Sequence, residues 1–196
     1  SFRNLNSSQI EIGSSNSQSS NLISGVKITD SVFDNINQQY DSLLTLSDGA
    51  ILEIKNCSFT NIFTFEEGAI IYAGSQNTIT KIHNSSFRNN TAVEGALFYI
   101  KDESVVKCYN CNINNNFAIT AGVTQTNGGG YFEMYNSDIK ENYALRYPIA
   151  QASEGVDISV FKKCEIHDNQ SLNNTQIQSE FTDVCDLLCF VPNEYA

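Results

Sequence analysis

The chain is poor in charge, and above all in positive charge. Only 17% of its 196 residues are charged, and 11 Lys and Arg stand against 22 Asp and Glu, so the net charge is −11. Binding to nucleic acid needs clustered Lys and Arg that neutralise phosphates, and docking on anionic lipid needs a similar cluster. The composition therefore argues against both partners. An acidic solenoid can bind calcium, but no pattern of ligands marks such a site, so we expect no cofactor.

Long apolar runs and helical periodicity are missing too. No run of about 18 apolar residues is present, so we expect no transmembrane helix and no membrane insertion in this segment. No segment repeats with the 3.6-residue period of a helical solenoid. The chain also lacks an initiator Met and a signal peptide, and Ser1–Asn4 already belongs to the repeat described next. We therefore expect a processed product or a piece of a longer protein.

What is abundant is asparagine, 24 residues in all, and much of it recurs at a fixed interval. The hexapeptide NCSFTN at 56–61 returns as NSSFRN at 84–89. Aligning the chain on the first residue of this motif gives six anchor positions, with spacings of 26, 28, 26, 26 and 27 residues. The anchors are Asp30, Asn56, Asn84, Asn110, Asn136 and Lys163. A period in this range indicates a solenoid.

Each repeat predicts three short strands. Residues two and four places before the anchor are mostly apolar and their neighbours polar, which is the alternation of a strand. An apolar residue stands three places after every anchor, and a third apolar segment, such as 69–72, ends in turn-forming residues. Stacked coils would pair like strands in parallel, about 4.8 Å apart. We predict an all-β parallel β-helix of six to seven coils over residues 1–180, with 181–196 as a cap or the start of a Cys-containing module.

The motif N-[CS]-x-F-x-N is followed by E-G-A-[IL] at 67–70 and 94–97. Together they resemble the right-handed parallel β-helix of the pectin-lyase type. They are also similar to the F-x-x-N and G-G-A-I repeats of bacterial polymorphic outer-membrane proteins and large protist surface proteins. The resemblance covers roughly residues 1–170, with Glu in place of the first Gly of G-G-A-I and a degraded element in the last two rungs. It implies a right-handed fold, shared by polysaccharide lyases and hydrolases and by non-enzymatic surface proteins.

The asparagines predict ladders and glycan sites. Asn at the anchor tolerates the left-handed conformation and can stack with its copies through side-chain hydrogen bonds. A second turn column lies five places after the anchor. Six N-x-[ST] sequons occur, and those at Asn56 and Asn84 fall in the anchor ladder, where we expect buried side chains. In a secreted protein we therefore expect glycans on Asn6, Asn89, Asn169 and Asn173.

Serine and cysteine alternate one place after the anchor, at Ser31, Cys57, Ser85, Cys111, Ser137 and Cys164. Cysteines two rungs apart would lie about 9.6 Å apart, too far for a disulfide, so we interpret this column as a small slot. Cys108 belongs to the core column. A Cys108–Cys111 bridge, or a redox or zinc role for this C-x-x-C, is an alternative with little support, because no second such motif is present. Candidate disulfides join Cys164 to Cys185 or Cys189, which favours an oxidising compartment.

A catalytic site on such a scaffold needs clustered carboxylates and a base. Glu141 and Asp168 share one column on adjacent rungs, so they would lie within about 5 Å. Such a pair is able to hold a proton or a cation, but we interpret the two as solvated turn residues. His167 precedes Asp168 on the opposite face of its strand, and His83 faces outward in the same column as Lys55 and Tyr109, as a surface residue. No nucleophile partners either histidine, and the rungs lack the long loops that build a cleft. We predict no catalytic residue and no metal site.

The leading hypothesis is a non-enzymatic, extracellular or cell-surface solenoid: a structural or adhesive segment of a larger surface or filament-forming glycoprotein. Open strand edges favour end-to-end contact with copies of itself or with other surface proteins. One outward column is a candidate contact strip, with aromatic rings that would stack on glycans or on another subunit. The contact strip is Lys55, His83, Tyr109, Tyr135 and Lys162. The alternatives are a carbohydrate-binding or polysaccharide-cleaving β-helix, and a passenger segment of a secreted toxin or autotransporter.

Overall fold

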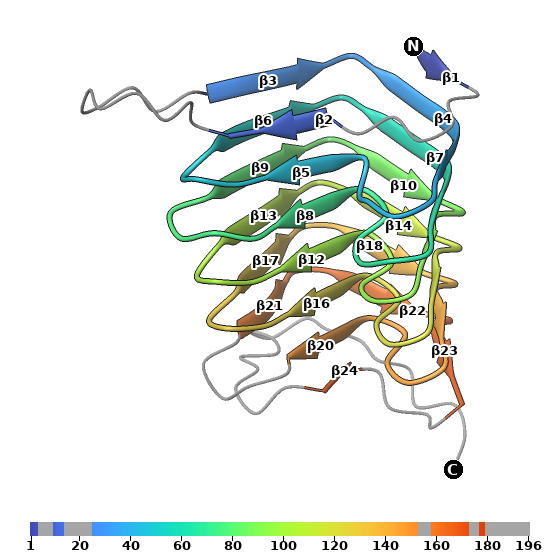
Figure 1. Ribbon diagram of the computed structural model, residues 1–196. Helices are drawn as coiled ribbons and strands as arrows, with labels where there is room; N and C mark the ends of the chain where they lie inside the picture. The colour runs from blue at the N-terminus through green and yellow to red at the C-terminus, as the bar shows by residue number, and fades with distance from the viewer. Residues whose placement is uncertain (4–9, 14–24, 153–157, 173–176, 179–196) are drawn as a thin grey trace.

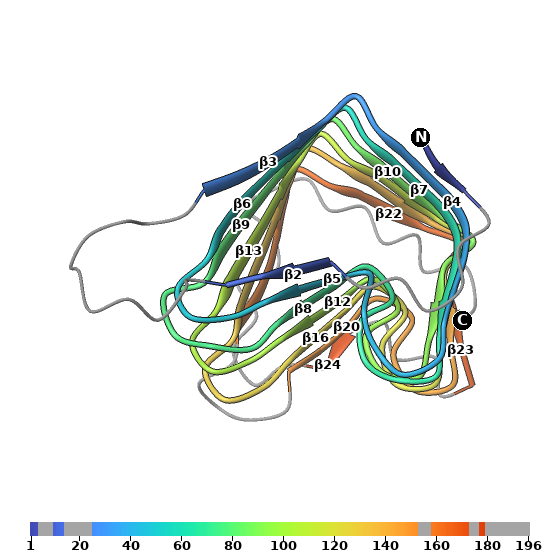
Figure 2. The same cartoon turned by 45° about the horizontal axis from the view of Figure 1, so that its top comes forward.

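The computed structural model describes residues 1–3, 10–13, 25–152, 158–172 and 177–178 as a parallel β-helix (Figure 1). Viewed from the N-terminal end in Figure 2, the chain winds clockwise as it moves away from the viewer, so the helix is right-handed. The described residues complete about five turns, fewer than the six to seven coils predicted. Within these ranges every element is a strand, and no helix is long and apolar enough to cross a membrane.

Three sheets run along the axis. The pre-anchor sheet stacks β3 (Gly25–Thr29), β6 (Ile51–Lys55), β9 (Ile79–His83), β13 (Val105–Tyr109), β17 (Tyr131–Tyr135) and β21 (Ile158–Lys162). The closing sheet stacks β2 (Ile10–Ile12), β5 (Leu44–Leu46), β8 (Ile71–Ala73), β12 (Phe98–Ile100), β16 (Thr124–Thr126), β20 (Ala150–Ala152) and β24 (Ile177–Gln178).

The post-anchor sheet lies between these two in each turn and bends in the middle. Its first part contains β1 (Phe2–Arg3), β4 (Val32–Gln38), β7 (Ser58–Thr64), β10 (Ser86–Arg88), β14 (Asn112–Asn114), β18 (Asp138–Lys140) and β22 (Glu165–His167). Beyond the bend, the end of β7 pairs with β11 (Thr91–Ala92), and β15 (Phe117–Ala118), β19 (Tyr143–Ala144) and β23 (Gln170–Ser171) follow on successive rungs. The upper strands β4 and β7 span the bend, whereas the lower rungs use two short strands each.

The strand register confirms the predicted columns. Phe59 pairs with Phe33 above and Phe87 below, and each of these side chains is buried. Their rings stack with centroids 4.9 Å and 5.1 Å apart and planes within 2°. The repeated motif therefore presents the same shape to each neighbouring rung, and the core is a set of axial ladders.

The corners explain why asparagine recurs. All six anchors have positive φ, as Asn84 (φ 49) and Asn110 (φ 53) do, and so do the residues five places later. Asn and Asp tolerate this left-handed conformation best among residues with a side chain. The anchor amides form the predicted ladder, with Asn110 Nδ2 donating to Asn84 Oδ1 at 3.2 Å and Asn136 Nδ2 to Asn110 Oδ1 at 2.6 Å. The expectation that they are buried was wrong: these side chains are exposed, because the corner turns them outward.

The alternating Ser/Cys column is a small buried slot, as predicted. Each side chain donates back to the carbonyl two residues earlier, as Ser85 Oγ does to His83 at 2.8 Å and Cys57 Sγ to Lys55 at 3.2 Å. The serine oxygens also accept the backbone N–H of the cysteine one rung above, at 3.1 Å for Ser85 and 2.9 Å for Ser137. The slot therefore requires a short side chain that donates a hydrogen bond.

A looped lobe lies between the bent sheet and the closing sheet, formed by residues 39–43, 65–70, 93–97, 119–123 and 145–149 (Figure 2). The E-G-A motif sits in it. Gly68 and Gly95 have φ of +55° and +53°, and an added Cβ would collide with the carbonyl oxygens of Ile71 and Phe98 respectively. Only glycine fits there, which accounts for the motif.

Candidate functional surfaces

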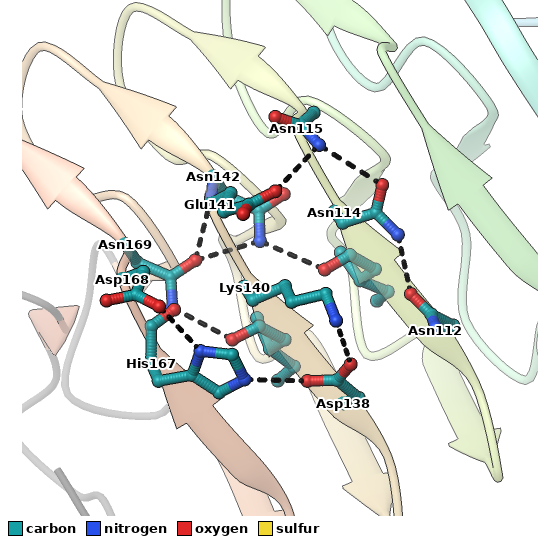
Figure 3. Close-up of polar contacts among 12 residues, drawn as sticks. Asn112, Asn114, Asn115, Asp138, Lys140, Glu141, Asn142, His167, Asp168 and Asn169 are labelled. Carbon is teal, nitrogen blue, oxygen red and sulfur yellow. Dashed lines mark hydrogen bonds and ion pairs between the residues drawn. The ribbon is translucent and has the colours of Figure 1, made fainter.

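The lower part of the post-anchor sheet carries the acidic side chains of the predicted Glu141–Asp168 column (Figure 3). His167 lies between two carboxylates: its Nδ1 is 2.9 Å from Asp168 Oδ2, and its Nε2 is 3.3 Å from Asp138 Oδ1. Lys140 Nζ lies 3.1 Å from the other oxygen of Asp138. The hydrogen bond to Asp168 raises the pKa of His167 above its usual value. Sequence reasoning placed His167 and Asp168 on opposite faces; the left-handed corner at Asp168 brings them together.

Glu141 and Asp168 do lie on adjacent rungs, but each carboxylate has its own partner. Asn115 Nδ2 donates to Glu141 Oε2 at 3.0 Å, while Asp168 contacts His167 (Figure 3). No group of three or more His, Cys, Asp or Glu suited to a metal ion is found in the part of the chain that the structure describes. The surface is therefore a solvated hydrogen-bonded and ion-paired array in which the carboxylates stabilise neighbouring side chains.

Beneath this array runs a second ladder, which sequence reasoning missed. Asn90, Asn116, Asn142 and Asn169 are buried six places after their anchors. Asn142 Nδ2 donates to Asn169 Oδ1 at 2.9 Å and to the carbonyl of Ile113 at 3.2 Å. The backbone N–H of Asn142 shares the same oxygen of Asn169 at 2.9 Å. These amides bind one rung to the next inside the wall of the solenoid.

This ladder corrects the expected glycan sites. Asn169 is 7% exposed, and its Nδ2 donates to the carbonyls of Ile139 at 2.9 Å and His167 at 3.0 Å. A glycan attached there would have no path to solvent and would remove a donor from the wall. Asn89 is exposed, as are Asn56 and Asn84, which we had excluded. Asn6 and Asn173 lie outside the described residues.

The contact strip forms one continuous outward column on the pre-anchor sheet, as predicted: Lys55 pairs with His83, His83 with Tyr109, and Tyr109 with Tyr135. The His83 and Tyr109 rings stack on each other, with centroids 4.9 Å apart and planes within 12°. Lys163 Nζ lies 5.3 Å from the centre of the Tyr135 ring. Ring faces are therefore turned along the axis toward neighbouring side chains, and the edges face solvent. This geometry disfavours stacking of a sugar on the strip.

The column beside the strip adds ion pairs. Glu53 contacts Lys55 at 2.6 Å and Lys27 at 3.5 Å, and Glu133 contacts Lys107 at 2.9 Å and Lys162 at 3.7 Å. Burial and the nearby Lys55 ammonium lower the pKa of His83. The pre-anchor face therefore combines aromatic edges with a positive local field.

A shallow groove of about 650 Å³ runs along the corner between the pre-anchor and post-anchor sheets. Its wall includes the exposed amides of Asn56, Asn84 and Asn110 and the side chains of Ser58, Ser86 and Asn112. These neutral donors and acceptors repeat on successive rungs, and one carboxylate, Asp30, lines the end of the groove and accepts from Asn56 Nδ2 at 3.0 Å. They suit a ligand with many hydroxyl groups better than a charged one.

A further polar network lies where the lobe meets the closing sheet. The backbones of Glu67 and Glu94, on adjacent rungs, pair in an isolated parallel β-bridge. Burial raises the pKa of Glu67, and the negative charge of Glu94 raises it further. Gln125 Nε2 donates to Glu94 Oε2 at 3.0 Å, and Asn127 Nδ2 to Tyr99 Oη at 2.6 Å. Burial raises the pKa of Tyr99 to about 12. Of these residues, sequence reasoning noted only the two glutamates, because the E-G-A motif marks the lobe but not the residues Tyr99 and Gln125 that it covers.

The four cysteines in the described residues, Cys57, Cys108, Cys111 and Cys164, are buried and form no disulfide with one another. Burial raises the pKa of Cys164 to about 11 and that of Cys108 as well, while the neighbouring Cys108 thiol lowers the pKa of Cys111. Cys185 and Cys189 lie outside the described residues, so their pairing with Cys164 stays a prediction.

Comparison of the chain with family models, with curated proteins and with solved structures finds no match.

Proposed function

We propose that the chain is a non-enzymatic structural or adhesive solenoid, a segment of a larger extracellular or cell-surface glycoprotein related to the β-helical surface-protein repeats that its motifs resemble. The observation that carries this proposal is the continuity of the axial ladders. Phenylalanine, asparagine and Ser/Cys columns pass through successive rungs, and each rung bonds the next at the same positions.

A rod of this kind has a fixed length and a repeated surface, which suits a spacer or an adhesive stalk. The exposed sequons at Asn56, Asn84 and Asn89 support an extracellular setting, because a glycan on any of them would point into solvent. The buried thiols of the slot, which are shielded from oxidants, are compatible with that setting.

The test is made on native protein, isolated with an antibody against this chain. Glycopeptide mass spectrometry would show hexose on at least one of Asn56, Asn84 and Asn89, and negative-stain microscopy would show rods or a surface coat. Unmodified asparagines in an intracellular protein would overturn the proposal.

A second candidate is a carbohydrate-binding or polysaccharide-cleaving β-helix, which the polar groove of about 650 Å³ favours. Its hydroxyl and amide groups repeat on successive rungs, as the residues of a polysaccharide do. Screening polysaccharides for binding and for cleavage, with and without calcium, tests it. Binding that is lost when both Asn84 and Ser86 are replaced by alanine would support this candidate, and binding that survives would not.

A further inference from the structure

Positive charge is concentrated on one face of an acidic protein. The outward side chains of the pre-anchor sheet include five lysines and two glutamates: Lys27, Lys55, Lys81, Lys107, Lys162, Glu53 and Glu133. This face therefore carries +3, and since the chain carries −11, the remainder carries −14. Charge separated in this way creates complementary fields on a single molecule.

Lys81 stands at the middle of this face. Its neighbours in register are Glu53 on one rung and Lys107 on the other. Glu53 contacts Lys27 and Lys55, and Lys107 contacts Glu133, whereas no carboxylate lies within ion-pair distance of Lys81 among the described residues. Lys81 is exposed, so the face presents an ammonium group that its own rungs do not neutralise.

The upper rungs of the lobe have the opposite character. Asp41 and Glu66 are exposed there, beside Tyr40 at 67% and Phe65 at 64% exposure. Among the described residues only five large apolar side chains are exposed, and three of them, Tyr40, Phe65 and Ile119, lie on the lobe. Exposed aromatic side chains are enriched at protein interfaces, and the carboxylates beside them make this part of the lobe complementary in charge to a lysine-bearing surface.

The two surfaces face in opposite directions. In Figure 2 the pre-anchor sheet (β3, β6, β9, β13) forms the upper left side of the cross-section, and the lobe projects at the lower right. Contact between the lobe of one molecule and the sheet of another would use two different surfaces, and contacts of this kind extend into open arrays unless they close a ring.

We propose that the pre-anchor face binds the acidic, aromatic lobe of a second copy of the chain. Asp41 and Glu66 lie on adjacent rungs of the lobe, and Lys81 and its register neighbours lie on adjacent rungs of the sheet, so one charge match brings the next rung into register too. The carboxylates of Asp41 and Glu66 lie against Lys81 and its neighbours. Tyr40 and Phe65 pack on the aromatic edges of the contact strip.

The size of the face sets the strength of the contact. Six strands of five residues cover about 24 Å by 16 Å, or about 400 Å² per partner, at standard strand dimensions. That is below the area of a standard stable interface, which is about 800 Å² per partner. The pairwise contact is therefore weak and salt-sensitive, and becomes durable only where many copies are held in parallel. This inference rests on the proposed structural function and adds that the binding partner is a second copy of the chain.

The experiment uses sedimentation velocity of the full chain at salt concentrations from about 20 mM to 500 mM, where screening of surface charge changes most. The average mass of the wild type should rise as salt falls. Lys81→Glu should weaken association at least tenfold, while Arg88→Glu, an equal change of charge on the exposed post-anchor surface, should leave it unchanged. Circular dichroism of each variant checks that it is folded.

A mixing experiment identifies the two surfaces. Lys81→Glu has a damaged face and an intact lobe, and the uncharged Asp41→Asn/Glu66→Gln variant has the reverse, so the two damaged surfaces do not attract each other. Each alone should be monomeric, and their mixture should form dimers that do not grow further. A wild type that stays monomeric at low salt, an Arg88→Glu variant as weak as Lys81→Glu, or a monomeric mixture would overturn the proposal. So would a monomer whose face instead binds polygalacturonate through Lys81. None of these results bears on where the native protein resides, so the proposed function is tested separately.

Discussion

The upper and lower rungs of the solenoid make the same corner with different chemistry. Six places after the anchor, the two upper rungs place Ile36 and Ile62, and both side chains are buried. The four lower rungs place Asn90, Asn116, Asn142 and Asn169 at the equivalent position, also buried. One inward column is thus filled by apolar side chains at one end and by amides at the other.

The backbone responds to this change. In the isoleucine rungs a single strand of seven residues, β4 or β7, runs through the bend. In the asparagine rungs the strand divides, as into β10 and β11, and the amide makes the connection between rungs: the N–H of Asn90 donates to Asn116 Oδ1 at 3.0 Å. An isoleucine stabilises the corner by packing in the core, and the hydrogen bonds between rungs are then made by the backbone alone. An asparagine side chain replaces some of these backbone hydrogen bonds with its own. Because successive amides bond to one another, the loss of one weakens the hydrogen bonds of its neighbours.

The largest expected effect comes from interrupting the amide ladder. Asn116→Ile makes a lower rung like an upper one, and should destabilise the protein by about 4 kcal/mol, because several buried groups lose a partner at about 1–3 kcal/mol each. The N–H and Nδ2 of Asn90 lose their acceptor, and the carbonyl of Phe87 loses its donor. Urea unfolding measures the loss.

The matched control is Ile62→Val in an upper rung, which should cost only about 1 kcal/mol. If Asn116→Ile costs no more than this control, the two corner chemistries are interchangeable and the ladder is not cooperative.

A smaller effect is expected in the neighbouring column, where the upper rungs stack phenylalanines and the lower ones place isoleucines. Phe59→Leu removes two stacked ring contacts, each worth about 0.5–1.5 kcal/mol, so we expect a loss of about 2 kcal/mol. Ile139→Leu in the lower half, a swap of equal volume, should cost less than about 1.5 kcal/mol. Chemical denaturation of both variants tests the comparison, and equal losses would show that ring stacking contributes nothing beyond volume.

The lobe of the upper rungs offers a stabilising change. Glu67 has a pKa raised above 4.5 by burial and by Glu94, so the folded state binds the proton more tightly than the unfolded state does. Its contribution to stability is therefore lost as the pH rises from 4.5 through that raised pKa. Glu67→Gln should stabilise the protein at pH 7 by about 0.5 kcal/mol, the size of a like-charge cross-strand pair.

Thermal unfolding at pH 4 and pH 7 measures this difference, with the exposed neighbour variant Glu66→Gln as the control. A gain at pH 7 that is equally large at pH 4 would show that the charge of Glu67 is not its cause.

The smallest effect belongs to the lower rungs. The pKa of His167 is raised, chiefly by Asp168, so its stabilising contribution is complete below 6.5 and is lost as the pH rises through the raised value. Asp168→Asn should return the pKa toward 6.5, and NMR titration of the imidazole protons follows it. Because the His167 side chain is 35% exposed, solvent screens the pair and little change in stability is expected. An unchanged pKa in the variant would assign the shift to Asp138 instead.

The sequence alone predicted the features that recur with the period of the repeat. The anchor column, the inward Phe/Ile column and the left-handed corners follow from spacing and from residue types that tolerate positive φ. The buried ladder was missed because asparagines stand side by side, as Asn89-Asn90 and Asn115-Asn116 do, and only the first of each pair was assigned to a corner. With Ile36 and Ile62 at the equivalent positions, the column does not look polar. The same oversight placed a glycan on Asn169.

The sequence did not show whether the side chains at the corners point into the core or out to solvent. The anchor amides were expected inside and lie outside, because a single left-handed residue reverses the side of the wall on which the chain places its next side chain. The lobe is harder still to predict, since Tyr99 and Gln125 are covered by loops from neighbouring rungs rather than by their own strand. Such burial depends on the stacked assembly and leaves no local pattern.

The parallel register also determines how the molecule would yield under tension. The hydrogen bonds between rungs point along the axis, so a pull along it loads one rung at the end of the rod rather than all rungs at once. A rung that detaches releases 26 residues, the separation of the paired amides of Asn90 and Asn116. At about 3.4 Å per extended residue this is about 90 Å of chain. Because the rungs differ by no more than two residues in length, a rod built in this way lengthens in nearly equal steps. Each step dissipates work, so the end rungs detach before the load breaks the rest of the rod.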